Sequence, residues 1–252
     1  MMLKKWENLP PEMQNDAVRE YYDILKKKRF SLFLKRAFDI VASLTMLILL
    51  SPVFLILAIA IKIDSKGPVF YRQVRVTQYG RRFRIFKFRT MVVDADKVGT
   101  QVTVKGDARI TRVGRVIRKF RLDEFPQLID ILRGTMTFVG TRPEVVKYVE
   151  QYTPEMMATL LLPAGVTSLA SILYKDEDKL LDGAADPDAT YVNEVVPDKM
   201  YYNLKAIREF GFFRDIKLMF MTVFAVLGKE YKGDLEEHKA SLKEKEEEEA
   251  GV

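Results

Sequence analysis

The strongest hydrophobic pattern in this chain is a nearly continuous apolar run from Ala37 to Ile61, in which Asp39 is the only charged residue. Its length exceeds the ~20 residues that a helix needs to cross the hydrocarbon core of a bilayer. The run begins too far from the N-terminus to be a secretory signal peptide. It therefore predicts a helix within a membrane, with Asp39 one turn after Lys35 and Arg36 and able to form a structural ion pair with either.

Two features of this run favour a re-entrant path over a simple crossing. Basic residues lie on both sides, within 26–36 and within 62–75, and flanks that stay in the cytoplasm retain positive charge. Near the middle, Pro52 cannot donate a hydrogen bond to the carbonyl of Ile48 and forces a kink, while the Ser51 hydroxyl could bond to a freed backbone group. We therefore predict a helix hairpin that is broken at Ser51 and Pro52.

The other patterns predict a mostly helical chain with a small β-hairpin or sheet. Residues 11–29 place apolar side chains at helical spacing and end in a basic stretch, which predicts a helix that lies on a membrane surface or faces solvent. Alternating apolar and basic residues over Val69–Val76 and Arg82–Phe88 predict two strands, and Pro163–Leu173 reads as a turn-rich stretch. Five further helices are predicted, at Arg109–Arg121, Asp123–Leu132, Pro143–Leu162, Pro197–Phe210 and Phe212–Leu227.

Composition narrows the chemistry that this chain can perform. It has no cysteine and a single histidine, His238, which lies in a charged C-terminal tail. Thiolate nucleophiles, cysteine-bound zinc, a Ser-His-Asp triad and a multi-histidine metal site are therefore excluded. Any catalysis has to use carboxylates, Lys, Arg, Tyr or a metal ion bound through oxygen.

Charge is distributed unevenly along the chain. Residues 229–252 carry five lysines and nine acidic residues, a net of −4, so the overall formal charge of +6 leaves +10 on residues 1–228. A basic body fits a partner that carries phosphates or an anionic lipid surface. Nucleic acid also fits the charge, but no RNA-binding motif or helix-turn-helix accompanies it, and a membrane helix argues against this partner.

The adjacent carboxylates Asp123 and Glu124 are the first candidates for chemistry, because they follow a strongly basic segment. One interpretation is structural, with the pair capping a helix and forming ordinary salt bridges. The other is functional, since a carboxylate can attack phosphorus and a hard cation such as Mg²⁺ takes oxygen ligands and bridges phosphates. The residues alone leave both interpretations open.

Several cations could bind phosphate groups beside that pair. Lys87 and Arg89 are two residues apart in the sequence, and Arg142 lies in a turn before Pro143. Arg75 lies on the first predicted strand and is expected to face solvent or substrate. Arginine offers planar bidentate donors and lysine a compact charge. Each of them taken singly is more often a solvated surface residue.

Taken in order, the motifs of this chain resemble the bacterial sugar transferase family, the monotopic phosphoglycosyl transferases. Each motif is short, but the ordered set is highly specific and spans residues 35–228. It comprises Lys35–Asp39, Ser51-Pro52, Gly67–Phe70, Arg72-Gln73, Phe86–Met91, Leu122–Leu128, Leu132–Gly134, Val139–Glu144 and Asp215–Lys217.

The resemblance implies a two-step transfer at a membrane surface. Asp123 would attack the β-phosphate of a UDP-sugar, form a covalent phosphosugar intermediate and release UMP. A polyprenyl phosphate, undecaprenyl phosphate, would then accept the phosphosugar as the first membrane step of exopolysaccharide, O-antigen or glycoconjugate synthesis. Glu124 would bind Mg²⁺ across the diphosphate, and Lys87, Arg142 and Asp215 match polar residues that the family uses at its site.

Pattern and resemblance together predict an α/β, mostly helical fold with an N-terminal re-entrant membrane helix hairpin, a small β-hairpin or sheet, and amphipathic helices at the membrane face. The predicted organisation is a surface helix (1–30), the re-entrant helix (31–66), a catalytic domain (67–228) and a charged, disordered tail (229–252). The predicted location is the bacterial inner membrane, with the catalytic domain on the cytoplasmic face, and a homodimer is compatible with this organisation.

Two departures from the family motifs bear on which sugar is transferred more than on catalysis. Thr141 replaces a proline before Arg142, and Ala164 is an additional residue in a downstream loop. The alternative hypothesis is a non-catalytic membrane-surface protein that keeps the fold in order to recruit partners, against which the intact Asp123, Glu124 and Lys87 weigh.

Overall fold

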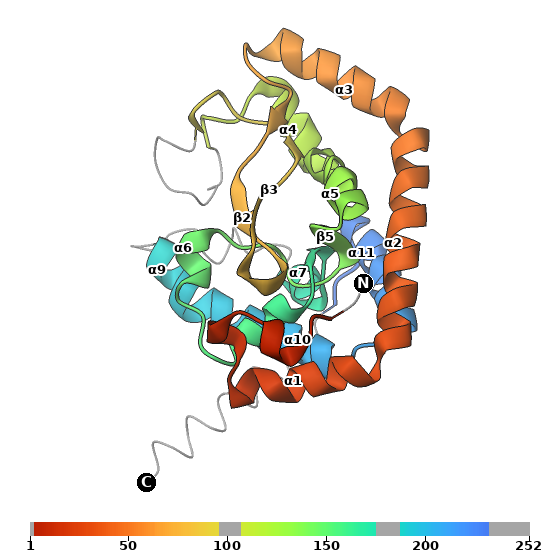
Figure 1. The fold of residues 1–252 in the computed structure, drawn as a ribbon. Helices are drawn as coiled ribbons and strands as arrows, with labels where there is room; N and C mark the ends of the chain where they lie inside the picture. Colours follow the sequence, from red (N-terminus) through yellow and green to blue (C-terminus); the bar gives the residue numbers. More distant parts are fainter. Residues whose placement is uncertain (1–2, 96–106, 175–186, 232–252) are drawn as a thin grey trace.

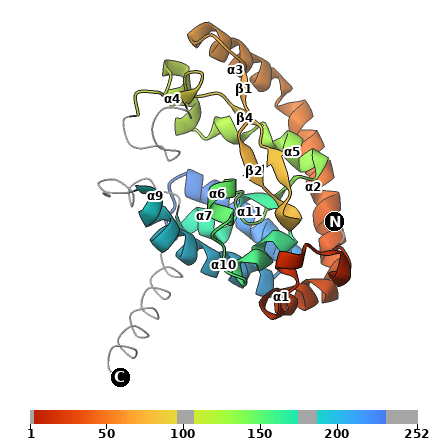
Figure 2. The same ribbon diagram turned by 60° about the vertical axis from the view of Figure 1, so that its left-hand side comes forward.

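The computed structural model describes residues 3–95, 107–174 and 187–231, and helices dominate it. Within these residues the β-structure consists of three two-stranded sheets. Helices α1, α2 and α3 run along one edge of the molecule and the other elements lie against their inner side (Figures 1 and 2). The tail is predicted to be disordered. Its residues from 232 onward lie outside the described part of the chain, so this stays a prediction.

The N-terminal segment belongs to the body of the protein. After the short 3₁₀ turns Trp6–Asn8 and Pro11–Met13, helix α1 (Asp16–Lys27) begins where the Asn15 side chain accepts a hydrogen bond from the amide of Val18. The apolar face of α1 is buried in a core that it shares with η6 and α10, and its members are Val18, Tyr21, Tyr22 and Leu25. The apolar face of α1 thus points into the protein, and a location of this helix at a membrane surface stays a prediction.

The long apolar run forms two helices that meet at the predicted break. Helix α2 (Arg29–Leu49) and helix α3 (Ser51–Asp64) are bent by 61° relative to each other at Leu50. The Ser51 hydroxyl donates to the carbonyl of Ile48 over 2.8 Å, and so satisfies the carbonyl that Pro52 cannot reach. The predicted break is confirmed.

The path of these helices differs from the predicted hairpin. Within the described residues no single helix is both long and apolar enough to cross a bilayer, whereas α2 and α3 meet that length and composition together as a bent pair. With only Leu50 between them, they form a bent rod and do not fold back antiparallel to each other. A re-entrant path through a membrane stays a prediction.

Helix α2 buries a polar stripe and exposes many of its apolar residues. The residues that it buries are Leu32 and the polar stripe Lys35, Asp39 and Ser43. Its exposed face includes Phe33 and Ile48. This distribution is the reverse of an ordinary surface helix and leaves a large apolar face uncovered by the protein.

The two predicted strands form one interrupted hairpin. Both strand pairs are antiparallel and share one register, with Phe70 opposite Phe88 and Val76 opposite Arg82. The amide of Ile85 donates to the carbonyl of Gln73 over 3.0 Å and continues the ladder between the two pairs. The pairs are β1 (Phe70–Tyr71) with β4 (Lys87–Phe88), and β2 (Val74–Val76) with β3 (Arg82–Arg84), with the 3₁₀ turn Gln78–Gly80 at the tip.

A tight turn follows helix α4 (Arg112–Lys119). Arg121 adopts a left-handed backbone conformation with a φ of 53°, and the next residues form the 3₁₀ turn η5 (Leu122–Glu124). Helix α5 (Gln127–Arg133) begins only after this turn and ends at Gly134 as predicted. Asp123 therefore lies between two helices and does not cap α5, which corrects the capping part of the structural interpretation and leaves its salt bridges to be examined at the site.

A parallel strand pair in the centre of the protein was not predicted. Strand β5 (Met136–Val139) pairs with β6 (Ala164–Thr167), inside the segment that was read as turn-rich. Helix α7 (Leu169–Leu173) follows β6 directly. The segment Pro143–Leu162, predicted as one helix, instead forms two short pieces, α6 (Val146–Val149) and the 3₁₀ helix η6 (Met156–Leu161).

The C-terminal helices complete the main core. Helix α10 (Val196–Arg208) and helix α11 (Phe212–Val226) agree with the predicted helices, and α10 follows α9 (Pro187–Thr190) and the π-helical turn η7 (Tyr191–Val195). Buried residues of α5, β5, α7, α10 and α11 form one continuous apolar cluster. This core fixes the ends of β5 and β6, from which the candidate site is built.

Candidate active site

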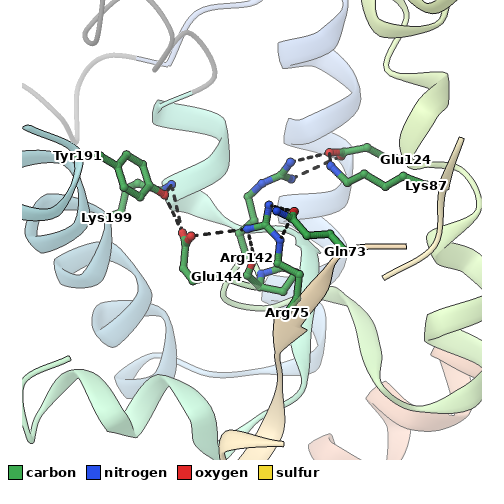
Figure 3. Close-up of polar contacts among 9 residues, drawn as sticks. Gln73, Arg75, Lys87, Glu124, Arg142, Glu144, Tyr191 and Lys199 are labelled. Carbon is green, nitrogen blue, oxygen red and sulfur yellow. Dashed lines mark hydrogen bonds and ion pairs between the residues drawn. The ribbon is translucent and has the colours of Figure 1, made fainter. Parts of the chain in front are cut away.

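Three charged side chains from distant parts of the sequence meet at one point. Glu124 in η5 lies between Lys87 of β4 and Arg142 of the loop that follows β5 (Figure 3). The Lys87 Nζ is 3.0 Å from the Glu124 Oε1, and the Arg142 Nη2 is 2.5 Å from the same oxygen. Glu124, Lys87 and Arg142, three of the residues singled out in the sequence, thus form one cluster.

Asp123 differs from Glu124 in its surroundings. It is half-buried and, among the described residues, it forms no ion pair within 4.0 Å, although Lys87 and Arg118 are close enough to act on its charge. Burial raises the pKa of the Asp123 carboxyl, and Lys87 opposes that shift. Burial also acts to raise the pKa of Glu124, but Arg142 and Lys87 outweigh it and hold that pKa below its usual range. The pair thus contains one carboxylate that two cations hold and one without an ion pair among the described residues.

The loop that carries Arg142 depends on a close approach between two glycines. The amide of Gly140 donates to the carbonyl of Thr167, and the amide of Gly165 donates to the carbonyl of Thr141, over 2.9 and 2.8 Å. A Cβ atom on Gly165 would lie 2.2 Å from the nitrogen and the oxygen of Gly140. The backbone that aims Arg142 at Glu124 is therefore packed too tightly for any side chain at Gly165.

Replacing Gly165 with alanine is expected to destabilise the protein by about 1–3 kcal/mol, because the extra methyl group has to push the Gly140 backbone away. For a chain of this size that corresponds to a fall in melting temperature of roughly 2–12 °C. Gly211→Ala is the control, since a Cβ atom there meets nothing within 4 Å. Equal shifts in the two variants, measured by thermal unfolding, would contradict the close approach.

A second polar network lies behind the Arg142 loop. The Arg75 guanidinium donates twice to Gln73 Oε1, at 2.9 and 2.6 Å, and once to the carbonyl of Pro143, at 3.1 Å. On its other side it is 3.9 Å from the Glu144 carboxylate. The Glu144 carboxylate in turn accepts a hydrogen bond from Tyr191 at 2.7 Å and faces Lys199 at 3.7 Å (Figure 3).

This network changes how Arg75 is understood. The sequence predicted Arg75 as a substrate-binding residue, whereas the structure shows it tying β2 to the residue that follows Arg142. Glu144, Tyr191 and Lys199, which were not singled out in the sequence, are all buried. Together they connect helix α10 and the turn η7 to the Arg142 loop.

Two further predicted residues lie outside the Glu124 cluster. Arg89 is buried, and its guanidinium donates to the Ser65 carbonyl and hydroxyl and to the Lys66 carbonyl, at the end of α3. These contacts fix the end of α3, and a role of Arg89 in binding phosphate stays a prediction. Asp215 accepts from Lys35 of α2 over 2.5 Å, so the structure ties it to the helix pair. Its role in binding substrate stays a prediction.

The Mg²⁺ ion predicted at the carboxylate pair stays a prediction. Within the described residues no group of three or more His, Cys, Asp or Glu side chains is placed to hold a metal ion. Asp123 and Glu124 nevertheless supply hard oxygen ligands, and Mg²⁺ is commonly held by one or two carboxylates together with phosphate oxygens. Because the Glu124 Oε1 already contacts two cations, the ion would have to compete with Lys87 and Arg142 for it.

Comparisons with known proteins agree with the sequence motifs. The model of the family described as "Bacterial sugar transferase" matches residues 30–229. The chain is 36% identical over 198 residues to a UDP-N-acetylgalactosamine-undecaprenyl-phosphate N-acetylgalactosaminephosphotransferase of Aeromonas hydrophila, and the match covers 77% of the chain and 44% of that protein. It is 39% identical over 196 residues to a UDP-glucose:undecaprenyl-phosphate glucose-1-phosphate transferase of Escherichia coli K12, which covers 76% of the chain and 39% of that protein.

A shorter relative matches along nearly its whole length. The exopolysaccharide production protein PSS of Rhizobium leguminosarum bv. phaseoli is 36% identical over 203 residues, which is 78% of the chain and 96% of the relative. The chain spans less than half the length of the first two relatives. The range matched by the family model includes Lys87, Glu124 and Arg142.

Proposed function

Because this chain belongs to the bacterial sugar transferase family, we propose that it transfers a sugar 1-phosphate from a UDP-sugar to a polyprenyl phosphate. The relatives' names specify undecaprenyl phosphate as acceptor and UDP-linked glucose or N-acetylgalactosamine as donors. The observation that carries the proposal is the pairing of an available carboxylate, Asp123, with a cation cluster of Lys87 and Arg142.

The geometry supports a displacement in two steps. In the first, a carboxylate oxygen of Asp123 attacks the β-phosphorus, and the bond from this phosphorus to the oxygen that bridges the two phosphates breaks, so that UMP leaves with that oxygen. In the second, a phosphate oxygen of the acceptor attacks the same phosphorus and breaks its bond to Asp123. Each step releases the electron pair of the broken bond to the departing oxygen, and Asp123 returns to its starting state.

The cations around Glu124 stabilise the charge that moves during these steps. Arg142 can bind two phosphate oxygens in one plane, and Lys87 adds a compact charge beside Asp123. Mg²⁺, when bound, would neutralise negative charge on the diphosphate. Glu124 holds both cations in place before the donor arrives, and would exchange part of these contacts for the substrate.

A membrane location follows from the inverted polarity of α2 and the exposed face of α3. The apolar residues Leu55, Ile56 and Ile59 of α3 are exposed, and only Ile61 of this helix is buried. Such a continuous apolar face is costly in water and is favourable against lipid. We infer that the pair enters the inner membrane re-entrantly, with the Glu124 cluster on the cytoplasmic side, as the basic flanks indicate.

The proposed function is tested by UMP release from a panel of UDP-sugars, using detergent-solubilised protein with Mg²⁺ and undecaprenyl phosphate. Release with one or two of the sugars, abolished by EDTA and restored by Mg²⁺, is the expected result, because the diphosphate needs its charge neutralised. EDTA-resistant release would contradict the metal requirement. An absence of release with every sugar, and of a covalent phosphosugar on Asp123, would favour a recruitment protein.

A further inference from the structure

An apolar pocket opens beside the Glu124 cluster. Its volume is about 720 Å³, within the range of roughly 300–1,000 Å³ that small-molecule sites occupy. Its walls come from α2, α5, β6, α7 and α11, which surround it from several directions. Apolar residues dominate the lining, among them Phe38, Phe138, Val166, Ile172, Met219 and Val223.

The pocket has one charged end. Glu124 and Arg142 of the reaction cluster line it, and so do Lys119 and Arg121 from the segment that leads into η5. The pocket therefore fits a molecule with an anionic group at one end and an apolar body. The charged end lies where the second displacement would take place.

The hydroxyl groups of the pocket do not suit a nucleotide or a sugar. Thr167 and Thr222 hydrogen-bond to each other over 2.7 Å, and Ser171 pairs with Ser168 over 3.0 Å. Each of these lining hydroxyls therefore already has a hydrogen-bond partner within the protein. A UDP-sugar bound here would bury polar groups without partners, which costs free energy, whereas a hydrocarbon chain needs none.

We propose that this pocket holds the first isoprene units of the polyprenyl phosphate acceptor, with its phosphate at the Arg142 end. The proposal rests on the transfer function above and assigns the acceptor's site to helix α11. The exposed apolar residues Phe220 and Val226 of α11 and Met46 of α2 lie along the pocket, so the rest of a long chain can continue from it over an apolar surface. The donor then has to approach the cluster from outside the pocket.

Two neighbouring positions on α11 provide a matched test. Val223 lines the pocket and Phe224 does not, although the two are similarly exposed, at 55% and 50%. Val223→Trp is expected to raise the KM for polyprenyl phosphate about tenfold by occupying the space of the apolar chain, with the KM for the UDP-sugar within about twofold of wild type. Phe224→Trp should leave both constants unchanged. An unchanged acceptor KM in Val223→Trp, or a parallel rise in both constants, would overturn the proposal.

Photolabelling gives a readout that needs neither a variant nor turnover. The wild-type chain is illuminated with a polyprenyl phosphate that carries a diazirine in its first isoprene units, and the labelled peptides are identified by mass spectrometry. Labels on Met219, Val223 or Ile172 are expected, and labels confined to α3 would overturn the proposal. A chain labelled in the pocket that releases no UMP from any UDP-sugar would contradict the transfer function while supporting the acceptor site.

Discussion

The Asp123→Asn variant is expected to lose UMP release by at least about 1,000-fold with every UDP-sugar, since residues that act directly in the chemical step show losses of that order or more. An amide has no anionic oxygen with which to attack phosphorus, so the covalent phosphosugar cannot form. The expected readouts are the absence of UMP and the absence of a phosphosugar mass on the peptide that contains residue 123.

The same substitution is expected to leave the fold intact, which makes the loss interpretable. Asparagine has nearly the shape of aspartate, and Asp123 forms no ion pair with the described residues that its loss would break. Asp23→Asn is the control, because it makes the same chemical change at a half-exposed position on α1, where only an i,i+4 pair with Arg19 is lost. Turnover of Asp123→Asn within about tenfold of wild type would mean that another group is the nucleophile.

Local rules of chain geometry predicted some features of the fold well. The consequence of Pro52 could be derived from its missing amide proton, and the Ser51 hydroxyl does bond to the carbonyl of Ile48. The alternation of apolar and basic residues predicted the hairpin, although its strands are interrupted near Gln73. Both features depend on residues that are close in the sequence.

Features that depend on distant residues could not be derived in this way. In the parallel pair, Met136 of β5 lies opposite Ala164 of β6. The small residues of β6 resemble those of a turn. The bend before η5 depends on a left-handed backbone at Arg121, a conformation that no pattern of polarity reveals. The inward polar stripe of α2 becomes visible only when its partners on β5 and α11 are known.

The candidate site shows the same division. Lys87, Glu124 and Arg142 come from three separate segments, and the family motifs, not the periodicity, placed them together. Arg89 was predicted from its strand position as a phosphate ligand, yet it is buried against the end of α3. Glu144 lies in a family motif, but its pairing with Tyr191 and Lys199 could not be predicted, because these two residues are distant in sequence and chemically ordinary.

Lys35 is the residue whose loss is expected to cost the most stability. Its Nζ lies 2.5 Å from the Asp215 carboxylate and donates to the carbonyl of Val139 over 2.7 Å. Asp39 lies one turn further along α2, where the sequence predicted an ion pair with either Lys35 or Arg36. Its carboxylate instead accepts from the Thr137 hydroxyl and the Phe138 amide, over 2.7 and 3.2 Å. One cation thus pairs with the half-buried Asp215, acts on the charge of the buried Asp39, and bonds to the end of β5.

Lys35→Met therefore leaves two carboxylates in the interior without their neighbouring cation, and the carbonyl of Val139 without a donor. Removing one member of a buried ion pair typically costs about 3–5 kcal/mol, because the remaining charge is neither paired nor solvated. The melting temperature in detergent should fall by roughly 6–20 °C, whereas Lys62→Met, which removes an exposed lysine from α3, should leave it nearly unchanged. Because Val139 directly precedes the Gly140–Arg142 loop, release of this carbonyl would also loosen the backbone that aims Arg142 at Glu124. A Lys35→Met protein that melts within about 2 °C of wild type would show that neither carboxylate depends on this cation.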